Sequence, residues 1–199
     1  ARERVQKTRH ALKGIMAGVQ TVLQDDPRLT CRLPGGRNPV RIICDSHLRI
    51  PLDSQLVQTA GEVPVIVATL SEDKDRTQAL EAKGVQVLRT KEKDGRIDLQ
   101  DLMQRLGQQG IDGILLEGGG TLNESALRAG IVQHVEAYIA PKLFGGSAPF
   151  TPVAGNGVDV PGQAWTLINQ KLTQIGEDYL IEGDVAAGPA CGMSDNRSF

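Results

Sequence analysis

The sequence has few aromatic residues, which make up 3% of its 199 positions. A surface that stacks several nucleic-acid bases needs such side chains, so the sequence argues against one. Charge of one sign is not in excess either, because 22 basic and 24 acidic residues leave a formal net charge of −2. This balance excludes a broad electrostatic surface for nucleic acid or an anionic membrane, but it leaves room for a local basic pocket that binds one phosphorylated small molecule.

Cysteines, metal-binding motifs and long apolar runs are also scarce. The three cysteines, Cys31, Cys44 and Cys191, are an odd number without close pairing, which favours a reducing, cytoplasmic setting over a disulfide-bonded fold. The apolar runs fall short of the roughly 18 residues that a membrane-spanning helix needs, and the charged first residues do not resemble a secretory signal. Neither a His-Glu-x-x-His motif nor a Cys-x-x-Cys pair is present, so we expect no metal site.

What the sequence does contain is an alternation of strand and helix patterns. Short β-branched runs predict strands at residues 40–45, 63–70, 85–90 and 111–117. Segments with helical start and stop signals, such as the candidate N-cap Ser71, predict helices at residues 71–84, 98–110 and 121–130. This alternation is typical of βαβ units and of a largely parallel sheet.

The two ends of the chain differ from this pattern. Residues 1–12 predict a largely solvated helix, and residues 14–23 predict a buried strand that runs into a turn. Strand-like segments follow near the C-terminus, at residues 134–145, 164–176 and 178–185. They predict an added antiparallel strand or hairpin.

The sequence therefore predicts an α/β fold in a single domain over residues 1–185. Neither an internal repeat nor a low-complexity linker divides this range. Residues 186–199 are small and polar without periodicity, so we expect a disordered or vector-derived tail there.

The segment ILLEGGGTLNES, residues 114–125, combines a strand end, three glycines and a helix start. Glycines allow backbone conformations closed to other residues, and the free N–H groups of a helix N-terminus favour anions. The spacing leaves two interpretations open, a tight strand-to-helix turn or a cradle for a phosphate group. Glu117 stands at the strand end, where it could cap the turn or bind a ligand hydroxyl or ring nitrogen.

A second group of polar residues lies between a predicted strand and a proline-rich loop. Asp25 and Asp26 precede Pro27, which by itself is typical of a turn. Arg28 and Arg32 follow closely, and an acid beside arginines could donate a proton or orient a phosphorylated sugar.

Arg9 and Ser46 are weaker candidates. Taken alone, Arg9 is typical of a solvated helix charge, and Ser46, which follows Asp45 at a strand end, is typical of a cap.

Four segments, in this order, resemble the reductase domain of the riboflavin-biosynthesis bifunctional deaminase-reductase: RHALKGIMAGVQTVLQDDPRLTCR, NPVRIICDS, ILLEGGGTLNESAL and EAYIAPKLFGG. The resemblance implies a fold similar to dihydrofolate reductase, with a mostly parallel sheet, an antiparallel C-terminal strand and helices on both faces. It also implies NADPH-dependent reduction of 5-amino-6-(5-phosphoribosylamino)uracil to 5-amino-6-(5-phosphoribitylamino)uracil. In that reaction hydride reaches C1′ of the ribose and an acid supplies a proton.

The resemblance also implies which residues form the site. Asp25 matches a cofactor-contacting position and is the expected acid near the ribose. The implied substrate contacts are Arg9, Leu29, Arg32 and Glu117, of which the arginines suit the ribose 5-phosphate. The implied NADPH contacts are Thr21, Asp25, Ser46, Gly119, Gly120, Thr121, Leu122, Asn123, Glu124 and Ser125.

Two departures from the family pattern stand out. The sequence has Gln20-Thr21-Val22 where the family usually has Gly-Thr-Val. The family's opening strand, with its Ser-Leu-Asp-Gly loop, would precede residue 1, and so would a fused deaminase domain. The resemblance further implies a homodimer.

Two alternatives remain open at this point. One is a related enzyme, either a stand-alone pyrimidinone reductase or a dihydrofolate reductase homologue, in which Arg9 and Arg32 would have no ribose phosphate to hold in the folate case. The other is a non-catalytic nucleotide-binding or oligomerisation module.

Overall fold

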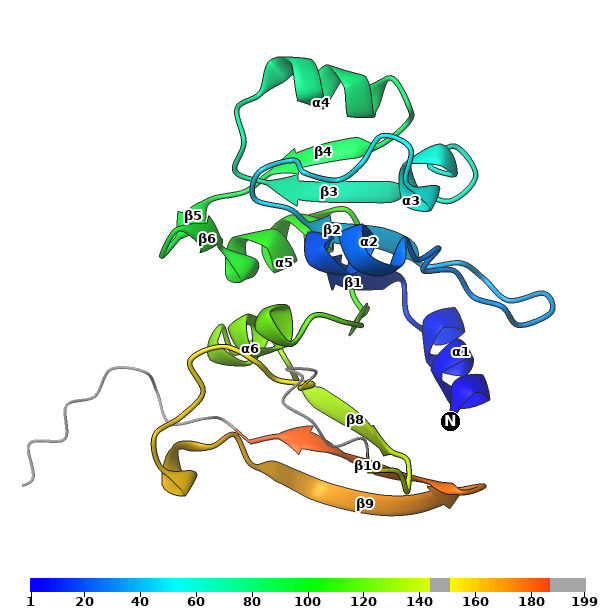
Figure 1. The fold of residues 1–199 in the computed structure, drawn as a ribbon, viewed down its shortest axis with the longest axis vertical. Helices are drawn as coiled ribbons and strands as arrows, with labels where there is room; N and C mark the ends of the chain where they lie inside the picture. The colour runs from blue at the N-terminus through cyan, green and yellow to red at the C-terminus, as the bar shows by residue number, and fades with distance from the viewer. Residues whose placement is uncertain (144–150, 187–199) are drawn as a thin grey trace, which may run out of the picture.

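The computed structural model describes residues 1–143 and 151–186, and Figure 1 shows how their helices and strands are arranged. Residues 187–199, nearly all of the expected tail, lie outside the described residues. The elements follow in the order α1 (Arg2–Ala11), β1 (Gly14–Gly18), α2 (Val19–Asp25), β2 (Val40–Cys44), α3 (Gln55–Gln58), β3 (Val65–Thr69), α4 (Lys74–Glu81), β4 (Gln86–Arg89), β5 (Glu92–Lys93), β6 (Arg96–Ile97), α5 (Leu99–Gln108), β7 (Ile114–Leu116), α6 (Gly120–Arg128), β8 (His134–Ile139), η1 (Pro161–Gln163), β9 (Leu167–Ile175) and β10 (Asp178–Val185).

The central sheet has five strands in the order β4-β3-β2-β1-β7, and all of them run parallel. Its inner strands β1, β2 and β3 are mostly apolar, and in β3 all five residues are buried. Such continuous apolar runs suit strands that are covered on both faces, because neither face meets water. The strands expected from β-branched runs are therefore confirmed.

Helices cover both faces of this sheet. One face buries a cluster to which α2, α3 and α4 contribute, and the other buries a cluster to which α5 and α6 contribute. The adjacent β1 residues Ile15 and Met16 point into different clusters, as the alternation of side chains along a strand requires. The expected α/β class with helices on both faces is confirmed.

Arg41 is an exception to the apolar pattern of the strands. This β2 side chain is fully buried and donates to Thr59, at 2.8 Å to Oγ1 and 3.0 Å to the carbonyl oxygen, and also to the Val63 carbonyl. Burial lowers the pKa of its guanidinium to about 10, so the group stays charged at neutral pH. Arg41 thus ties β2 to the turn that follows α3.

The antiparallel part of the fold is larger than the expected strand or hairpin. Strands β8, β10 and β9 form a sheet of their own, in which Leu180 of β10 lies opposite Tyr138 of β8 and Thr173 of β9. Leu180 is fully buried. Figure 1 shows this sheet beyond α6, separate from the parallel strands.

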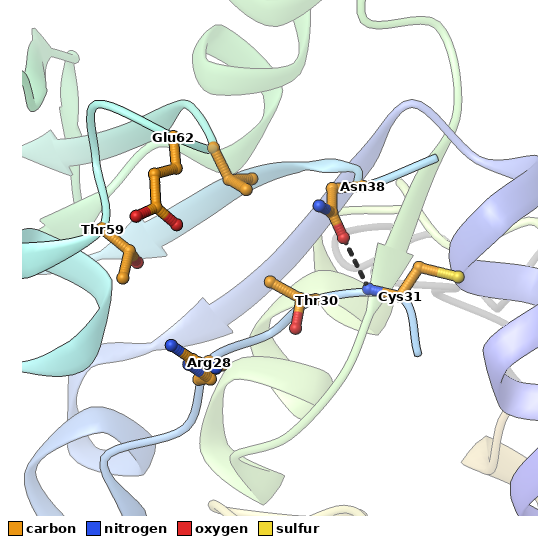
Figure 2. Close-up of a pocket in the computed structure, with 7 residues that line it drawn as sticks. Arg28, Thr30, Cys31, Asn38, Thr59 and Glu62 are labelled. Carbon is orange, nitrogen blue, oxygen red and sulfur yellow. Dashed lines mark hydrogen bonds between the residues drawn. The ribbon is translucent and has the colours of Figure 1, made fainter. Parts of the chain in front are cut away.

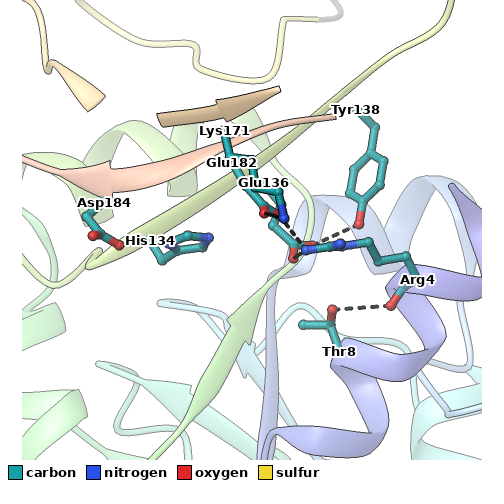
Figure 3. A network of polar contacts seen from close by, with 8 residues as sticks. All are labelled: Arg4, Thr8, His134, Glu136, Tyr138, Lys171, Glu182 and Asp184. Carbon is teal, nitrogen blue, oxygen red and sulfur yellow. Dashed lines mark hydrogen bonds and ion pairs between the residues drawn. The ribbon is translucent and has the colours of Figure 1, made fainter. Parts of the chain in front are cut away.

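A polar cluster connects α1 to this second sheet (Figure 3). Arg4 of α1 pairs with Glu182 of β10 and, at 3.4 Å, with Glu136 of β8, two carboxylates that lie directly opposite each other. Tyr138 donates to the second oxygen of Glu136 at 2.8 Å. Burial first, and then this hydrogen bond, raises the pKa of the Tyr138 hydroxyl to about 12. Arg4 thereby compensates a like-charge pair that would otherwise be unfavourable.

Several elements differ from the sequence-based expectation. Residues 19–25 form the helix α2, where a turn was expected, and α3 and the β5-β6 hairpin were not expected at all. The N-cap of α4 is Asp73, which accepts from Arg76 N at 2.9 Å, while Ser71 accepts from Asp73 N. Within the described residues, every helix is too short or too polar to cross a membrane.

Candidate active site

A large cavity lies at the carboxyl ends of β1, β2 and β7. Its volume is about 1110 Å³. Ligands of open α/β sheets bind at this edge, because loops there diverge and the helix N-termini face it. The lining residues are Gly18, Val19, Gln20, Thr21, Gln24, Asp25, Cys44, Ser46, His47, Arg49, Gly95, Arg96, Ile97, Leu99, Gly118, Gly119, Gly120, Thr121, Leu122, Ser125, Thr151, Pro152 and Ala154.

The glycine turn forms one side of this cavity. Gly118 and Gly119 have φ values of 101° and 82°, which L side chains rarely adopt. A Cβ at Gly118 would also lie 3.3 Å from Thr21 Oγ1, so the turn and α2 approach closely. Helix α6 begins at Gly120, and no side chain caps its N-terminus. Its first backbone N–H groups therefore lie at the cavity edge without a hydrogen bond to a capping side chain. Both features suit a phosphate group.

The two adjacent acids are separated by the end of α2. Asp25 is the last residue of that helix, is exposed and lines the cavity. Asp26 has a left-handed backbone, with φ 40°, and its Oδ1 accepts from Gln55 N at 2.8 Å. The expectation that both acids follow a strand is wrong, because a helix intervenes. Thr21 and Ser46, two other expected cofactor contacts, also line the cavity.

Arg9 and Glu117 are brought together next to the glycine turn, but they bind each other. Arg9 Nε and Nη2 lie 2.8 Å and 2.7 Å from Glu117 Oε2, and Nη1 donates to the Thr30 carbonyl at 2.8 Å. Arg9 is only 9% exposed, so the expectation of a solvated helix charge is wrong for this residue. Both contacts go to Oε2, which fixes the orientation of the Glu117 carboxylate.

The other two expected substrate contacts differ in exposure. Leu29 is 5% exposed with φ 49°, and its side chain belongs to the hydrophobic core, so only its backbone could face a ligand. Arg32 has an exposed side chain, and its backbone N–H donates to Gln6 Oε1 at 2.7 Å. Neither residue lines the large cavity.

Within the expected cofactor-binding run, Asn123 and Glu124 do not line the cavity. Asn123 Nδ2 donates to the Pro152 carbonyl at 2.8 Å. Glu124 is 5% exposed and pairs with Arg128 on the same helix. The other five residues of the run do line the cavity. The helix therefore presents one side to the cavity and another to residues 151–157.

Three further cavity residues with basic side chains were not predicted from the sequence. His47 and Arg49 follow β2 directly, and their position beside Ser46 was a usable signal. Arg49 Nε lies 3.9 Å from Oδ1 of the buried Asp45. Arg96 belongs to the β5-β6 hairpin and donates to Ser125 Oγ at 3.3 Å. The dipeptide Asp94-Gly95 is a sequence signal for such a hairpin, because a two-residue turn needs positive φ at both positions. Both residues have positive φ in the structure.

Cys44 also reaches the cavity, at the end of β2. Burial, followed by the neighbouring charge of Asp45, raises the pKa of its thiol to about 12. The thiol is therefore neutral at physiological pH and is not a nucleophile. It packs against the α5 and α6 side of the core, as expected for a small core residue.

A smaller cavity of about 210 Å³ lies at the opposite, amino edge of the sheet (Figure 2). Its residues precede strands, as Asn38 does before β2 and Glu62 before β3. Asn38 Oδ1 accepts from Cys31 N at 2.9 Å, which closes the loop around it. Its place and size do not suit a dinucleotide. In the part of the chain that the structure describes, no group of three His, Cys, Asp or Glu side chains could hold a metal ion.

Comparison with known proteins identifies relatives of this fold and sequence. A model of the RibD C-terminal domain matches residues 1–181. The riboflavin biosynthesis protein RibD of Actinobacillus pleuropneumoniae is 51% identical over 182 residues, which cover 92% of this chain and 48% of that protein. The 2,5-diamino-6-ribosylamino-4(3H)-pyrimidinone 5′-phosphate reductase of Methanothermobacter thermautotrophicus is 37% identical over 184 residues, which cover 90% of this chain and 82% of that protein.

A solved structure has the same fold. It is the diaminohydroxyphosphoribosylaminopyrimidine deaminase/5-amino-6-(5-phosphoribosylamino)uracil reductase of Thermotoga maritima, with a TM-score of 0.69 and 26% identity, covering 93% of this chain and 48% of that one. The chain thus spans about half the length of the RibD protein and of this bifunctional enzyme. Since the family model covers nearly the whole described chain, the chain belongs to the RibD C-terminal domain family.

Proposed function

We propose that the chain reduces 5-amino-6-(5-phosphoribosylamino)uracil to 5-amino-6-(5-phosphoribitylamino)uracil with NADPH. The observation that carries this proposal is the cavity at the carboxyl edge of the sheet, which combines a glycine turn at a helix start with the exposed acid Asp25. The bifunctional enzyme of Thermotoga maritima is named for reduction of this substrate.

The cavity fits a dinucleotide. Its volume of about 1110 Å³ exceeds that of an ordinary small-molecule site, and its glycines leave space that side chains would fill. The residues that would hold the cofactor are Thr21, Asp25, Ser46, Gly119, Gly120, Thr121, Leu122 and Ser125. When bound, NADPH supplies the hydride, and the protein supplies orientation and a proton.

We propose NADPH over NADH because of the charges in the cavity. Arg49 and Arg96 carry positive charges, and Asp25 is the single acid among the lining residues. NADPH carries an extra phosphate on its adenosine ribose, and arginines can form charge-assisted hydrogen bonds with it. The uncharged hydroxyl of NADH at that position would gain less binding energy from the same arginines. Arg49 is suited to this role because its 3.9 Å contact with Asp45 leaves donors for a ligand.

Asp25 is the proposed proton donor to the reacting sugar, since its carboxyl group is exposed to the cavity. Glu117 would bind the pyrimidine, because Arg9 occupies Oε2 and Oε1 can accept from a ligand N–H or hydroxyl. Arg32, with its exposed side chain, suits the ribose 5-phosphate better than the buried Arg9 does. Arg9 would then act mainly by orienting Glu117.

A second candidate substrate is favoured by one relative. The Methanothermobacter enzyme is named for a 2,5-diamino-6-ribosylamino-4(3H)-pyrimidinone 5′-phosphate, in which an amino group stands at C2 where the uracil has a carbonyl oxygen. Parallel assays of NADPH consumption with the uracil, the pyrimidinone and dihydrofolate would separate the three possibilities. We predict that the uracil is turned over faster than the other two compounds. Turnover of dihydrofolate alone would contradict the proposal.

The proposal extends to the whole protein. We propose that a deaminase domain and the family's Ser-Leu-Asp-Gly strand and loop precede residue 1, which agrees with the 48% coverage of the RibD relative. Turnover assays therefore use the protein extended to include that segment. We also propose a cytoplasmic protein, consistent with the free thiols of Cys31 and Cys44.

We further propose a homodimer. Ile139, Leu172 and Tyr179 are 47%, 67% and 41% exposed on the antiparallel sheet. Tyr179 lies opposite Ile139, and Leu172 lies opposite Ile181, two residues further along β10, so all three share one face. A second copy would cover this apolar face. Sedimentation of increasing protein concentrations tests this, and a monomer at all concentrations would contradict it.

A further inference from the structure

One wall of the cavity comes from a segment far from the glycine turn in sequence. Thr151, Pro152 and Ala154 line the cavity together with the start of α6. We call residues 151–157 the strap. Figure 1 shows the chain after residue 151 passing beside α6. The shape of the cavity therefore depends on where the strap sits.

The first contact that places the strap is with the backbone of α6. Ala154 N donates to the Gly120 carbonyl at 3.0 Å. A Cβ at Gly120 would lie 2.6 Å from the Thr151 carbonyl oxygen and 2.9 Å from Ala154 Cβ. Only glycine permits this approach, so the glycine turn serves the strap as well as the ligand.

The polar side chains of α6 add further contacts. Asn123 Nδ2 donates to the Pro152 carbonyl at 2.8 Å. Arg128 pairs with Glu124, and its Nη2 donates to the Gly157 carbonyl at 2.6 Å. The Arg128 guanidinium also lies 5.6 Å from the centre of the Trp165 ring, within reach of a cation–π contact.

Glu124 is packed directly beneath the strap. Its side chain is 7% exposed, and a Cβ at Gly155 would lie 3.1 Å from its carboxylate. A buried carboxylate needs a charged partner, and Arg128 is that partner. The planar guanidinium binds the carboxylate through Nε and the carbonyl through Nη2 in a fixed geometry, whereas the donors of a lysine all lie on one freely rotating nitrogen. Glu124 thus fixes the orientation in which Arg128 reaches Gly157.

We propose that Glu124 and Arg128 are positioning residues that hold the strap as a wall of the dinucleotide cavity. This inference rests on the proposed function, and it changes the role of Glu124, which the family resemblance implied to be a direct cofactor contact. Glu124 acts on the cofactor through Arg128 and the strap, without touching it.

A double-mutant cycle tests the proposal. Glu124→Ala, Arg128→Ala and the double variant are compared by calorimetric titration with NADPH. Because both residues act through one contact, we expect each single variant to weaken binding roughly tenfold, the size of one lost charged hydrogen bond, and the double variant to be no worse. Arg128→Lys should recover only part of the affinity.

The matched control is Arg105→Ala on the neighbouring helix α5. Arg105 pairs with Asp101 at 2.7 Å in the same i, i+4 arrangement, but neither residue lines the cavity. We expect this variant to leave NADPH affinity unchanged. If Glu124→Ala weakens binding while Arg128→Ala does not, Glu124 is a direct contact and the proposal is wrong. Additive losses would also contradict it.

Hydrogen exchange supplies a readout that does not depend on the cofactor. We expect the Ala154 N–H to exchange faster in Arg128→Ala than in the unsubstituted protein, with α4 unchanged. Unaltered exchange at Ala154 would overturn the proposal even if a variant folds poorly in other respects. If the unsubstituted protein binds no NADPH but the exchange result holds, the proposed function fails while the role of the strap contacts stands.

Discussion

Asp25 and Asp26 are neighbours with different surroundings. Asp26 has its carboxylate bound to Gln55 N at 2.8 Å, next to a backbone with φ 40°. Asp25 points an exposed carboxylate at the cavity. The Asp26 carboxylate is held by the fold, and the Asp25 carboxylate is available to a ligand. Each acid can therefore serve as the control for the other.

We predict that Asp25→Asn lowers turnover about 100-fold or more, because an amide cannot donate the proton that general acid catalysis requires. NADPH binding should be retained, since asparagine keeps the size and the acceptor oxygen. Asp26→Ala should keep turnover but lose about 1 kcal/mol of the free energy of unfolding with its hydrogen bond. The rate of NADPH consumption measures turnover in both variants, and chemical unfolding measures the loss of stability in Asp26→Ala. Undiminished turnover in Asp25→Asn would remove it from the mechanism.

The basic residues after β2 lead to a prediction about cofactor choice. Arg49→Ala should weaken NADPH binding about tenfold and leave NADH binding unchanged, because only NADPH carries the additional phosphate. Arg89→Ala is the control, since Arg89 is half exposed at the end of β4 and does not line the cavity. Calorimetric titrations with NADPH and NADH give the ratio of the two dissociation constants for each variant. An equal loss for both would place Arg49 elsewhere than at that phosphate.

Among the elements, the start of α6 has the large cavity on one side and the strap on the other. Gly120 is the residue where the two meet, because its missing Cβ admits the Thr151 carbonyl. Gly107 in α5 is a useful contrast, since a Cβ there would meet nothing within 4 Å. The same substitution should have opposite effects at the two positions.

Gly120→Ala should displace the strap, lower the melting temperature and weaken NADPH binding. Gly107→Ala should raise the free energy of unfolding by about 0.5–1 kcal/mol, because alanine loses less backbone entropy in a helix. Thermal unfolding measures the stability of the Gly120→Ala and Gly107→Ala variants, and calorimetric titration measures their NADPH affinity. Unchanged NADPH affinity in Gly120→Ala would show that the approach of the strap does not shape the cavity.

The sequence predicted the parallel strands and the long helices, because β-branched runs and capping signals are local. It did not predict α2, because the apolar run 14–23 suits a strand as well as a strand followed by a short helix. The partners of Asn123 and Arg128 lie 29 residues away, so no local pattern could show that these side chains face the strap. The glycine turn, Thr21, Asp25 and Ser46 line one cavity, and their roles as ligand contacts stay predictions.

At the scale of the whole molecule, the two sheets are linked by α1 and by the segments around α6. Among the described residues, β7 pairs only with β1, and β8 pairs only with β10. Each strand thus has an edge at which another strand could add. We expect the proposed opening strand to pair at one of these edges, close to Glu117 at the end of β7. The cavity itself is formed within this chain.

Calorimetric titration of the chain with NADPH shows directly whether the cavity binds the cofactor. We predict saturable binding of one NADPH per chain in the micromolar range, with weaker binding of NADH. Weaker binding in Gly120→Ala and unchanged binding in Gly107→Ala would locate the binding site at the glycine turn. Absence of saturable binding to the unsubstituted chain would show that this cavity is not the cofactor site of a reductase.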